Sequence, residues 1–288
     1  MNQTKHETRY KEPFDLHLHS NCSDGSDTPA RVVERSAERG LTLIALTDHD
    51  CVTGVTEAVL AGEQLGVRVL PAIEMDTEWP HELHILGLDI DILEPRLIAA
   101  LETAQKRRGL RNAEIADRLK SAGYDITPYL IGGTEIATRL NIALALIDGG
   151  FADNIKDAFV RFLRKGCPGY FSVERFSPEE VISLVLGAGG VPVWAHPMHG
   201  RPDVHKLTDR LKSFGLMGVE AYHPSLSEGE GELLISIARQ QRMIVTCGSD
   251  YHGANRPDVL PGQTWREHAA LRECRALFEN RPQITARG

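Results

Sequence analysis

The chain has few cysteines, no long apolar run and no excess of positive charge, and each shortage excludes a class of protein. Its five cysteines are odd in number and never form a Cys-x-x-Cys pair, which argues against a disulfide framework and a thiolate zinc site. No apolar stretch is long enough to span a bilayer, so no membrane partner is expected. The net charge is −8, so we expect no stable binding of duplex nucleic acid.

The charged and apolar fractions are those of an ordinary globular protein. A chain of 288 residues suffices for one large α/β barrel domain or for two ordinary domains. The N-terminal segment Met1–Pro13 is polar and lacks the apolar core of a signal peptide. We therefore expect a cytoplasmic protein, and the sequence does not indicate its oligomeric state.

Short apolar runs alternate with helix-like segments, which predicts an α/β fold with a mostly parallel sheet or barrel. The expected strands are Phe14–His19, Leu41–Thr47, Val67–Glu74, Glu82–Ile90, Val191–His196, Gly218–Tyr222 and Met243–Ser249. The expected helices begin at Thr28, Thr53, Ser177, Val204, Ser227 and Glu267. From Arg96 to about Phe162 the chain instead has continuous helical periodicity, and Arg161–Tyr170 is expected to be a loop. The predicted organisation is a first barrel part at 14–95, a helical insertion at 96–170, a second barrel part at 171–255 and a C-terminal tail at 256–288.

Histidines and carboxylates follow four of the apolar runs. The motifs are DLHLHSNCSD at 15–24, ALTDHD at 45–50, AHP at 195–197 and SDYH at 249–252. Side chains alternate along a strand, so His17 and His19 share one face, and so do Asp250 and His252. Because parallel strands deliver distant residues to one end of a barrel, we expect the clusters to meet there. Imidazole and carboxylate groups suit divalent Zn, Mn or Fe, so the pattern predicts a metal site.

Taken in order, DLHLHSNCSDG, ALTDHD, AIEMDTEW, HELHILG, WAHP and GSDYHG resemble the motifs of the PHP (polymerase and histidinol phosphatase) superfamily. The resemblance extends from Phe14 to Gly253. It implies a distorted (β/α)7 barrel with a trinuclear metal site at the strand C-termini. The insertion and Pro168-Gly169-Tyr170 are more similar to one branch, which contains nucleoside 3′,5′-bisphosphate phosphatases and 5′-to-3′ exoribonucleases. The insertion is then expected to lie over the active-site face.

The resemblance also implies which residues hold three divalent ions of Mn, Fe or Zn. The first ion takes His17, His19, Glu74 and Asp250; the second takes Glu74, His84 and His196; the third takes Asp24, His49 and His252. Glu74 would bridge two ions, because a carboxylate can do so and an imidazole cannot. His81 competes with His84, which is favoured because it lies inside the expected strand. Asp48 or Asp50 could orient a ligand imidazole or simply begin a helix.

Substrate contacts are expected from the insertion and from two loops of the barrel. The residues predicted for this role are Arg139, Lys165, Arg201 and His223. Arg139 and Arg201 match positions where the branch has arginines near the substrate, and arginine suits phosphate recognition. The chain departs from the branch at Asn141 and Leu144, where the relatives carry a histidine and a second arginine. Other histidines, including His199, are expected at the surface.

The function implied is hydrolysis of a phosphate ester by metal-activated water, with no separate catalytic side chain. The expected substrate is a small-molecule phosphate ester of a nucleotide, such as a nucleoside 3′,5′-bisphosphate, or the 5′ end of a short oligonucleotide. Alternatives are a phosphatase of a non-nucleotide metabolite such as histidinol phosphate, a hydrolase of amides, and a non-catalytic metal-binding PHP module. The filled set of ligand positions favours an enzyme over the non-catalytic module.

Overall fold

The computed structural model describes residues 12–130 and 137–281. They form two compact units, one made of the residues up to Ile98 together with those from Phe176 onwards, the other of Ala99–Arg175. Most of the polar N-terminal segment lies outside the described residues, as does Ile136, which contributes to the predicted helical period. Within the described ranges, no helix is both long and apolar enough to cross a membrane.

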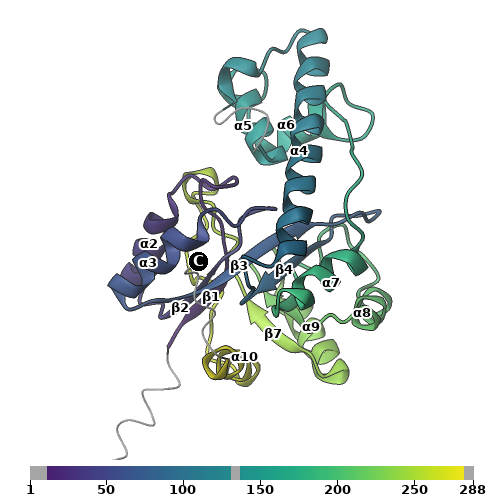
Figure 1. The fold of residues 1–288 in the computed structure, drawn as a ribbon. Helices are drawn as coiled ribbons and strands as arrows, with labels where there is room; N and C mark the ends of the chain where they lie inside the picture. Colours follow the sequence, from purple (N-terminus) through teal and green to yellow (C-terminus); the bar gives the residue numbers. More distant parts are fainter. Residues whose placement is uncertain (1–11, 131–136, 282–288) are drawn as a thin grey trace, which may run out of the picture. The chain divides into compact units, whose positions relative to one another are not determined.

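A seven-stranded sheet forms the centre of the first unit (Figure 1). Its strands are β1 (Phe14–Leu18), β2 (Leu43–Leu46), β3 (Arg68–Asp76), β4 (His84–Leu88), β5 (Val191–Trp194), β6 (Gly218–Tyr222) and β7 (Ile244–Cys247). They are hydrogen-bonded in chain order from β1 to β7. β4 is antiparallel to β3 and to β5, and the other adjacent pairs are parallel.

The sheet nearly closes on itself between β1 and the chain that follows β7. The backbone N of His19 donates to the carbonyl of Tyr251, and the backbone N of Asp250 donates to the carbonyl of His17, both at 2.9 Å. The helices α2 (Pro29–Glu38), α3 (Val55–Leu65), α7 (Pro178–Gly187), α8 (Val204–Ser213), α9 (Glu228–Gln241) and α10 (Ala269–Asn280) lie around the sheet (Figure 1). The expected distorted (β/α)7 barrel is confirmed.

The helices begin where the sequence provides caps. The Thr28 side chain accepts a hydrogen bond from the backbone N of Arg31 at the start of α2. Ser177 and Ser227 each form a capping box with the glutamate three residues later, at the starts of α7 and α9. Gly66 ends α3 in the left-handed conformation, with φ of 70°.

Successive side chains of β1 point alternately to the helices outside the sheet and into the barrel. Leu18 packs against Val32 and Val33 of α2 on the outside of the sheet. His17 points the other way, into the barrel, where it is fully buried. Packing between the sheet and α2 thus holds β1 in position, and the position of β1 directs His17 into the barrel.

The second unit is helical, as its periodicity predicts. α4 (Pro95–Ser121) starts in the first unit and continues into the second, which also contains α5 (Arg139–Asp148), α6 (Ile155–Ala158), and the short turns η2 (Thr127–Tyr129) and η3 (Phe159–Leu163). Its core includes Ile115, Leu119, Leu146 and Phe162. The predicted loop from Arg161 starts slightly later, because η3 continues to Leu163. That the unit covers the active-site face stays a prediction.

Candidate metal centre

The predicted metal ligands come together at one end of the barrel. The C-terminal ends of the parallel strands meet there, and the reversed β4 brings its first residue, His84, to the same end, opposite Asp76 of β3. Each predicted ligand belongs to a group of side chains whose ligand atoms lie within 4.8 Å of one another. These residues are His17, His19, Asp24, His49, Glu74, His84, His196, Asp250 and His252. The exposed His81 is not among them, whereas His84 is.

Glu74 occupies the middle of this cluster and is 1% exposed. Its Oε2 lies 3.3 Å from Nε2 of His17, 3.3 Å from Nε2 of His19 and 3.2 Å from Nδ1 of His49. Its Oε1 lies 2.9 Å from Nδ1 of His84 and 3.0 Å from Nε2 of His196. Oε2 therefore faces three imidazoles and Oε1 faces two others, an arrangement in which one carboxylate can serve two cations.

Asp250 completes the first group. Its Oδ1 lies 3.5 Å from Nε2 of His17 and 3.2 Å from Nε2 of His19. Its backbone is in the left-handed region with φ of 56°, and His196 has φ of 31°. Such conformations are costly for residues other than glycine and occur most often where function requires them.

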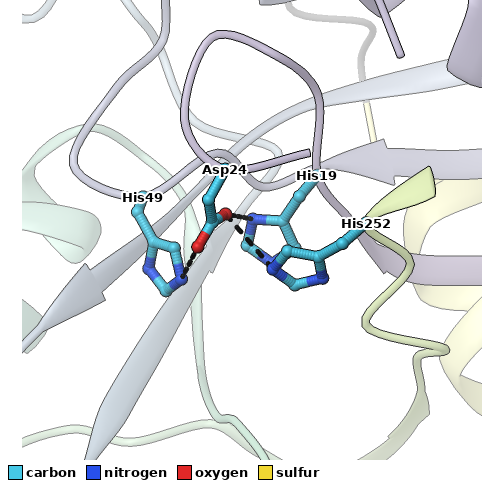
Figure 2. A group of neighbouring side chains, drawn as sticks. All are labelled: His19, Asp24, His49 and His252. Carbon is cyan, nitrogen blue, oxygen red and sulfur yellow. Dashed lines mark ion pairs between the residues drawn. The ribbon is translucent and has the colours of Figure 1, made fainter. Parts of the chain in front are cut away.

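Asp24 lies between the imidazoles of His19, His49 and His252, as Figure 2 shows. Its Oδ1 is 3.2 Å from Nε2 of His252 and 3.8 Å from Nδ1 of His19, and its Oδ2 is 3.7 Å from Nε2 of His49. His19 thus faces Asp24 with one ring nitrogen and Asp250 with the other. The structure places His19 between two groups, although the resemblance assigns it to the first alone.

The hydrogen bonding of the buried ring nitrogens indicates whether the cluster suits metal ions. Within the described residues, no hydrogen bond satisfies Nε2 of His17, either nitrogen of His19, Nδ1 of His49 or Nε2 of His252. Leaving one buried polar atom unpaired costs about 1–3 kcal/mol. A set of such atoms facing carboxylates fits cations that accept nitrogen and oxygen ligands, such as divalent Zn, Mn or Fe.

The charges of the cluster are strongly coupled. Burial lowers the pKa of His19, but Asp250 and Glu74 outweigh it and raise the pKa to about 9. At His84 the carboxylates of Asp76 and Glu74 likewise outweigh burial and raise the pKa to about 10. At His49 burial dominates and lowers the pKa to about 4. Without cations, protons on His19 and His84 therefore balance the buried carboxylates.

Two further carboxylates hold the ligands in position, and both are fully buried. Oε1 of Glu220 on β6 lies 3.0 Å from Nδ1 of His17, and its Oε2 accepts a hydrogen bond of 2.8 Å from the backbone N of His196. Asp15 accepts hydrogen bonds from the backbone N atoms of His17 and Ser249, at 3.1 and 3.0 Å. Such partners fix the ring orientation of metal-binding histidines. The sequence analysis missed Glu220, whose one signal is a carboxylate inside an apolar strand.

Asp48, one of the two carboxylates that flank His49, accepts hydrogen bonds from Ser20 and Ser23. Its Oδ1 accepts hydrogen bonds from the backbone N of Ser20 at 2.8 Å and from Oγ of Ser23 at 2.6 Å. Its Oδ2 accepts from Oγ of Ser20 at 2.6 Å. Asp48 therefore shapes the loop that carries Asp24, in addition to any role beside His49.

The sequence analysis also missed residues at the rim. Oδ1 of Asp76 lies 3.2 Å from Nε2 of His84, and Arg256 donates from Nη1 to Oδ2 of Asp250. His199, expected at the surface, is partly buried, with its ring centroid 4.4 Å from that of His196. The reason is that the loop after β5 turns back over the centre, with the backbone N of His199 donating to the carbonyl of His196.

Among the predicted substrate contacts, His223 lies against the metal centre. It is buried, with Nε2 3.4 Å from Oδ2 of Asp250 and Nδ1 2.8 Å from Oγ of Ser225. Arg201 is exposed on the loop after His196 and has φ of 51°. The binding role of both residues stays a prediction.

Arg139 and Lys165 belong to the second unit. The Arg139 guanidinium donates to the carbonyls of Leu163 and Phe171, at 3.3 and 3.0 Å, and Lys165 is exposed. Asn141, where the chain departs from the branch, accepts from the backbone N of Thr138 at 2.7 Å in the capping box of α5. The asparagine at this position therefore stabilises the start of a helix.

Comparisons with known proteins agree with this geometry. A PHP domain model matches residues 15–125. A 3′,5′-nucleoside bisphosphate phosphatase from Chromobacterium violaceum is 34% identical over 83% of this chain and 87% of its own length. A 5′-3′ exoribonuclease from Haemophilus influenzae is 31% identical over 83% of this chain and 89% of its own. A phosphoribosyl 1,2-cyclic phosphate 1,2-diphosphodiesterase from Eggerthella lenta is 33% identical over 83% of this chain and 94% of its own length.

Solved structures extend the likeness to the whole fold. An amidohydrolase from Chromobacterium violaceum, with bound sulfate and no metal, has a TM-score of 0.85 and 32% identity, covering 95% of this chain and 99% of its own. A proposed metal-dependent phosphoesterase from Bifidobacterium adolescentis has a TM-score of 0.81 and 29% identity, covering 92% and 96%. Barrel and site together define the class of hydrolases with a histidine and carboxylate metal centre. The chain belongs to the PHP family.

Proposed function

We propose that the chain is a metal-dependent phosphoesterase that hydrolyses a phosphate ester of a nucleotide or the 5′ end of a short RNA. The observation that carries this proposal is Glu74, whose two oxygens face separate sets of imidazoles in a buried cluster. The relatives support the reaction class, since they are a phosphatase, an exoribonuclease and a phosphodiesterase by name. All three names denote hydrolases of phosphoric ester bonds, and the chain is a hydrolase of this kind.

The proposed centre holds three divalent ions, of Mn, Fe or Zn, on the nine clustered ligands. Glu74 is shared between the first ion, with His17, His19 and Asp250, and the second, with His84 and His196. Asp24, His49 and His252 hold the third. When bound, such ions stabilise the charge of the phosphoryl group and make a water molecule acidic enough to react near neutral pH.

The protein's own contribution is to orient and enclose this centre. Glu220 and Asp15 fix His17, and Glu220 also fixes the backbone of His196, so the ligand geometry is set before a substrate arrives. His223 is a predicted substrate contact beside the proposed ligands, because its Nε2 faces Asp250. Arg201 follows on the exposed loop after His196, where it can meet the rest of a substrate.

The test is hydrolysis by manganese-loaded protein of adenosine 3′,5′-bisphosphate, a 5′-phosphorylated short RNA, histidinol phosphate and a panel of amides. Inorganic phosphate as product indicates a phosphatase, and 5′-mononucleotides indicate an exoribonuclease. We expect Glu74→Gln to lose activity by at least about a hundredfold, because losing even a partner that only orients a ligand costs ten- to hundredfold. Glu273→Gln, an exposed glutamate on α10, is the matched control.

Metal content is measured on the same samples. Full activity and full metal content in Glu74→Gln would contradict the shared role of this carboxylate. Cleavage of amides without cleavage of any phosphate ester would contradict the proposed reaction class. If histidinol phosphate were the only substrate hydrolysed, the proposed nucleotide substrate would be wrong.

A further inference from the structure

The two oxygens of Asp250 have different surroundings. Oδ1 faces the imidazoles of His17 and His19, at 3.5 and 3.2 Å. Oδ2 accepts a hydrogen bond from Nη1 of Arg256 and lies 3.4 Å from Nε2 of His223. One oxygen is therefore directed toward the proposed metal site, while the other is held by a permanent positive charge.

Arg256 reaches this buried carboxylate from the solvent side. It follows η4 (Gly253–Asn255), the turn directly after His252, and its backbone N donates to the carbonyl of Gly253 at 3.2 Å. Its side chain is 38% exposed, whereas that of Asp250 is 6% exposed. Burial opposes the charge of the guanidinium, but Asp250, Asp24 and Glu74 outweigh burial and raise its pKa. Arg256 is thus a cation in the field of carboxylates from every proposed ligand group.

The Arg256 guanidinium has more N–H donors than its hydrogen bond to Asp250 uses. Arginine carries five N–H groups, and among the described residues Asp250 is the one hydrogen-bond partner of the Arg256 side chain. A planar guanidinium can pair with two phosphate oxygens at once, which a lysine cannot do. A half-exposed arginine fixed beside a metal ligand therefore has the chemistry of a phosphate contact.

We propose that Arg256 binds the phosphoryl group of the substrate with its free N–H groups while Nη1 keeps Asp250 in place. This inference rests on the proposed phosphoesterase function. It gives the barrel unit a phosphate-binding arginine of its own, on the same loop as His252.

The experiment measures binding of inorganic phosphate to manganese-loaded protein by isothermal titration calorimetry, together with KM for adenosine 3′,5′-bisphosphate. The variants are Arg256→Gln and Arg256→Lys, with Arg239→Gln, an exposed arginine on α9, as the matched control. At equal manganese occupancy we expect Arg256→Gln to weaken phosphate binding and raise KM by roughly ten- to hundredfold, as for a lost charge-assisted hydrogen bond. Arg256→Lys should fall between wild type and Arg256→Gln, and Arg239→Gln should match wild type.

Unchanged phosphate affinity in Arg256→Gln would overturn the inference, and so would a wild-type protein that binds no phosphate. A loss of affinity that disappears once manganese saturates the variant would also overturn it, because Arg256 would then act only through Asp250. If Arg256→Gln does not fold, Arg256→Lys carries the same comparison. Wild-type protein that binds phosphate through Arg256 but hydrolyses no ester would uphold the inference and refute the proposed function.

Discussion

Gly248 is a position where the barrel interior leaves no room for a side chain. A Cβ atom placed there would lie 2.3 Å from Cβ of His17 and 2.1 Å from Oε1 of Glu220. Both separations are far shorter than van der Waals contact, and both neighbours belong to the hydrogen-bonded pair that orients His17. We therefore predict that Gly248→Ala separates His17 from Glu220.

The magnitude follows from two costs. Adding a methyl group to a filled interior costs about 1–3 kcal/mol, and losing a hydrogen bond to a charged group costs about 1.5–3 kcal/mol. Together they predict a decrease of about 2.5–6 kcal/mol in the free energy of unfolding. Because Glu220 orients a proposed ligand, manganese affinity should also fall by about ten- to hundredfold.

Urea unfolding of metal-free protein, followed by circular dichroism, measures the first quantity, and manganese titration measures the second. Gly229→Ala on α9 is the matched control, since no atom lies within 4 Å of a Cβ placed there. Gly229 lies in the first turn of α9, where glycine costs less than in a helix interior, so this control should be stabilised by less than about 1 kcal/mol. A Gly248→Ala protein within about 0.5 kcal/mol of wild type, with unchanged manganese affinity, would refute the steric reasoning.

Three further predictions concern charge and local structure. The pKa values of His19 and His84, about 9 and 10, keep both protonated at pH 7.5 in the metal-free chain. Metal loading should therefore release protons, and calorimetry in buffers of different ionisation enthalpy measures this release. The affinity for manganese should rise as the pH is raised toward these pKa values and should fall on acidification. Glu220→Gln should lower manganese affinity about ten- to hundredfold in equilibrium dialysis, and unchanged affinity would exclude its orienting role. Asn141→Ala should lower stability by about 0.5–1.5 kcal/mol in urea unfolding, because the backbone N of Thr138 loses its hydrogen-bond acceptor at the start of α5, while bound manganese stays constant.

The barrel and the positions that cluster in it follow from local sequence patterns. Alternation in Asp15–His19 places His17 and His19 on one face, and the apolar runs identify the strands on which or after which the clustered residues lie. Capping signals at Thr28, Ser177 and Ser227 locate three helices to within a residue or two. These features depend on neighbours a few residues apart, which a single sequence contains.

The supporting residues depend on contacts that no helix or strand period predicts. Glu220 reads as a lone acid in an apolar strand, and its role appears only when β6 lies beside β5 and faces β1 across the barrel. Arg256 lies in a stretch without periodicity, and its partner Asp250 is defined by the turn between them. The first contact is made by the tertiary fold and the second by an irregular turn, so the spacing rules of helices and strands predict neither.

The reversed direction of β4 makes the connection between β3 and β4 unlike the others at this end of the barrel. Residues 77–83 leave and rejoin the sheet at the same end, and Thr77 closes their base by donating from N and Oγ1 to the carbonyl of Leu83, at 3.2 and 2.7 Å. A parallel connection must cross the barrel with a helix, so changing its length displaces packed structure. Residues 77–83 contain no helix of their own, so an insertion there lengthens a loop at the end of the barrel that holds the clustered residues, which makes this loop a place to engineer a different substrate preference.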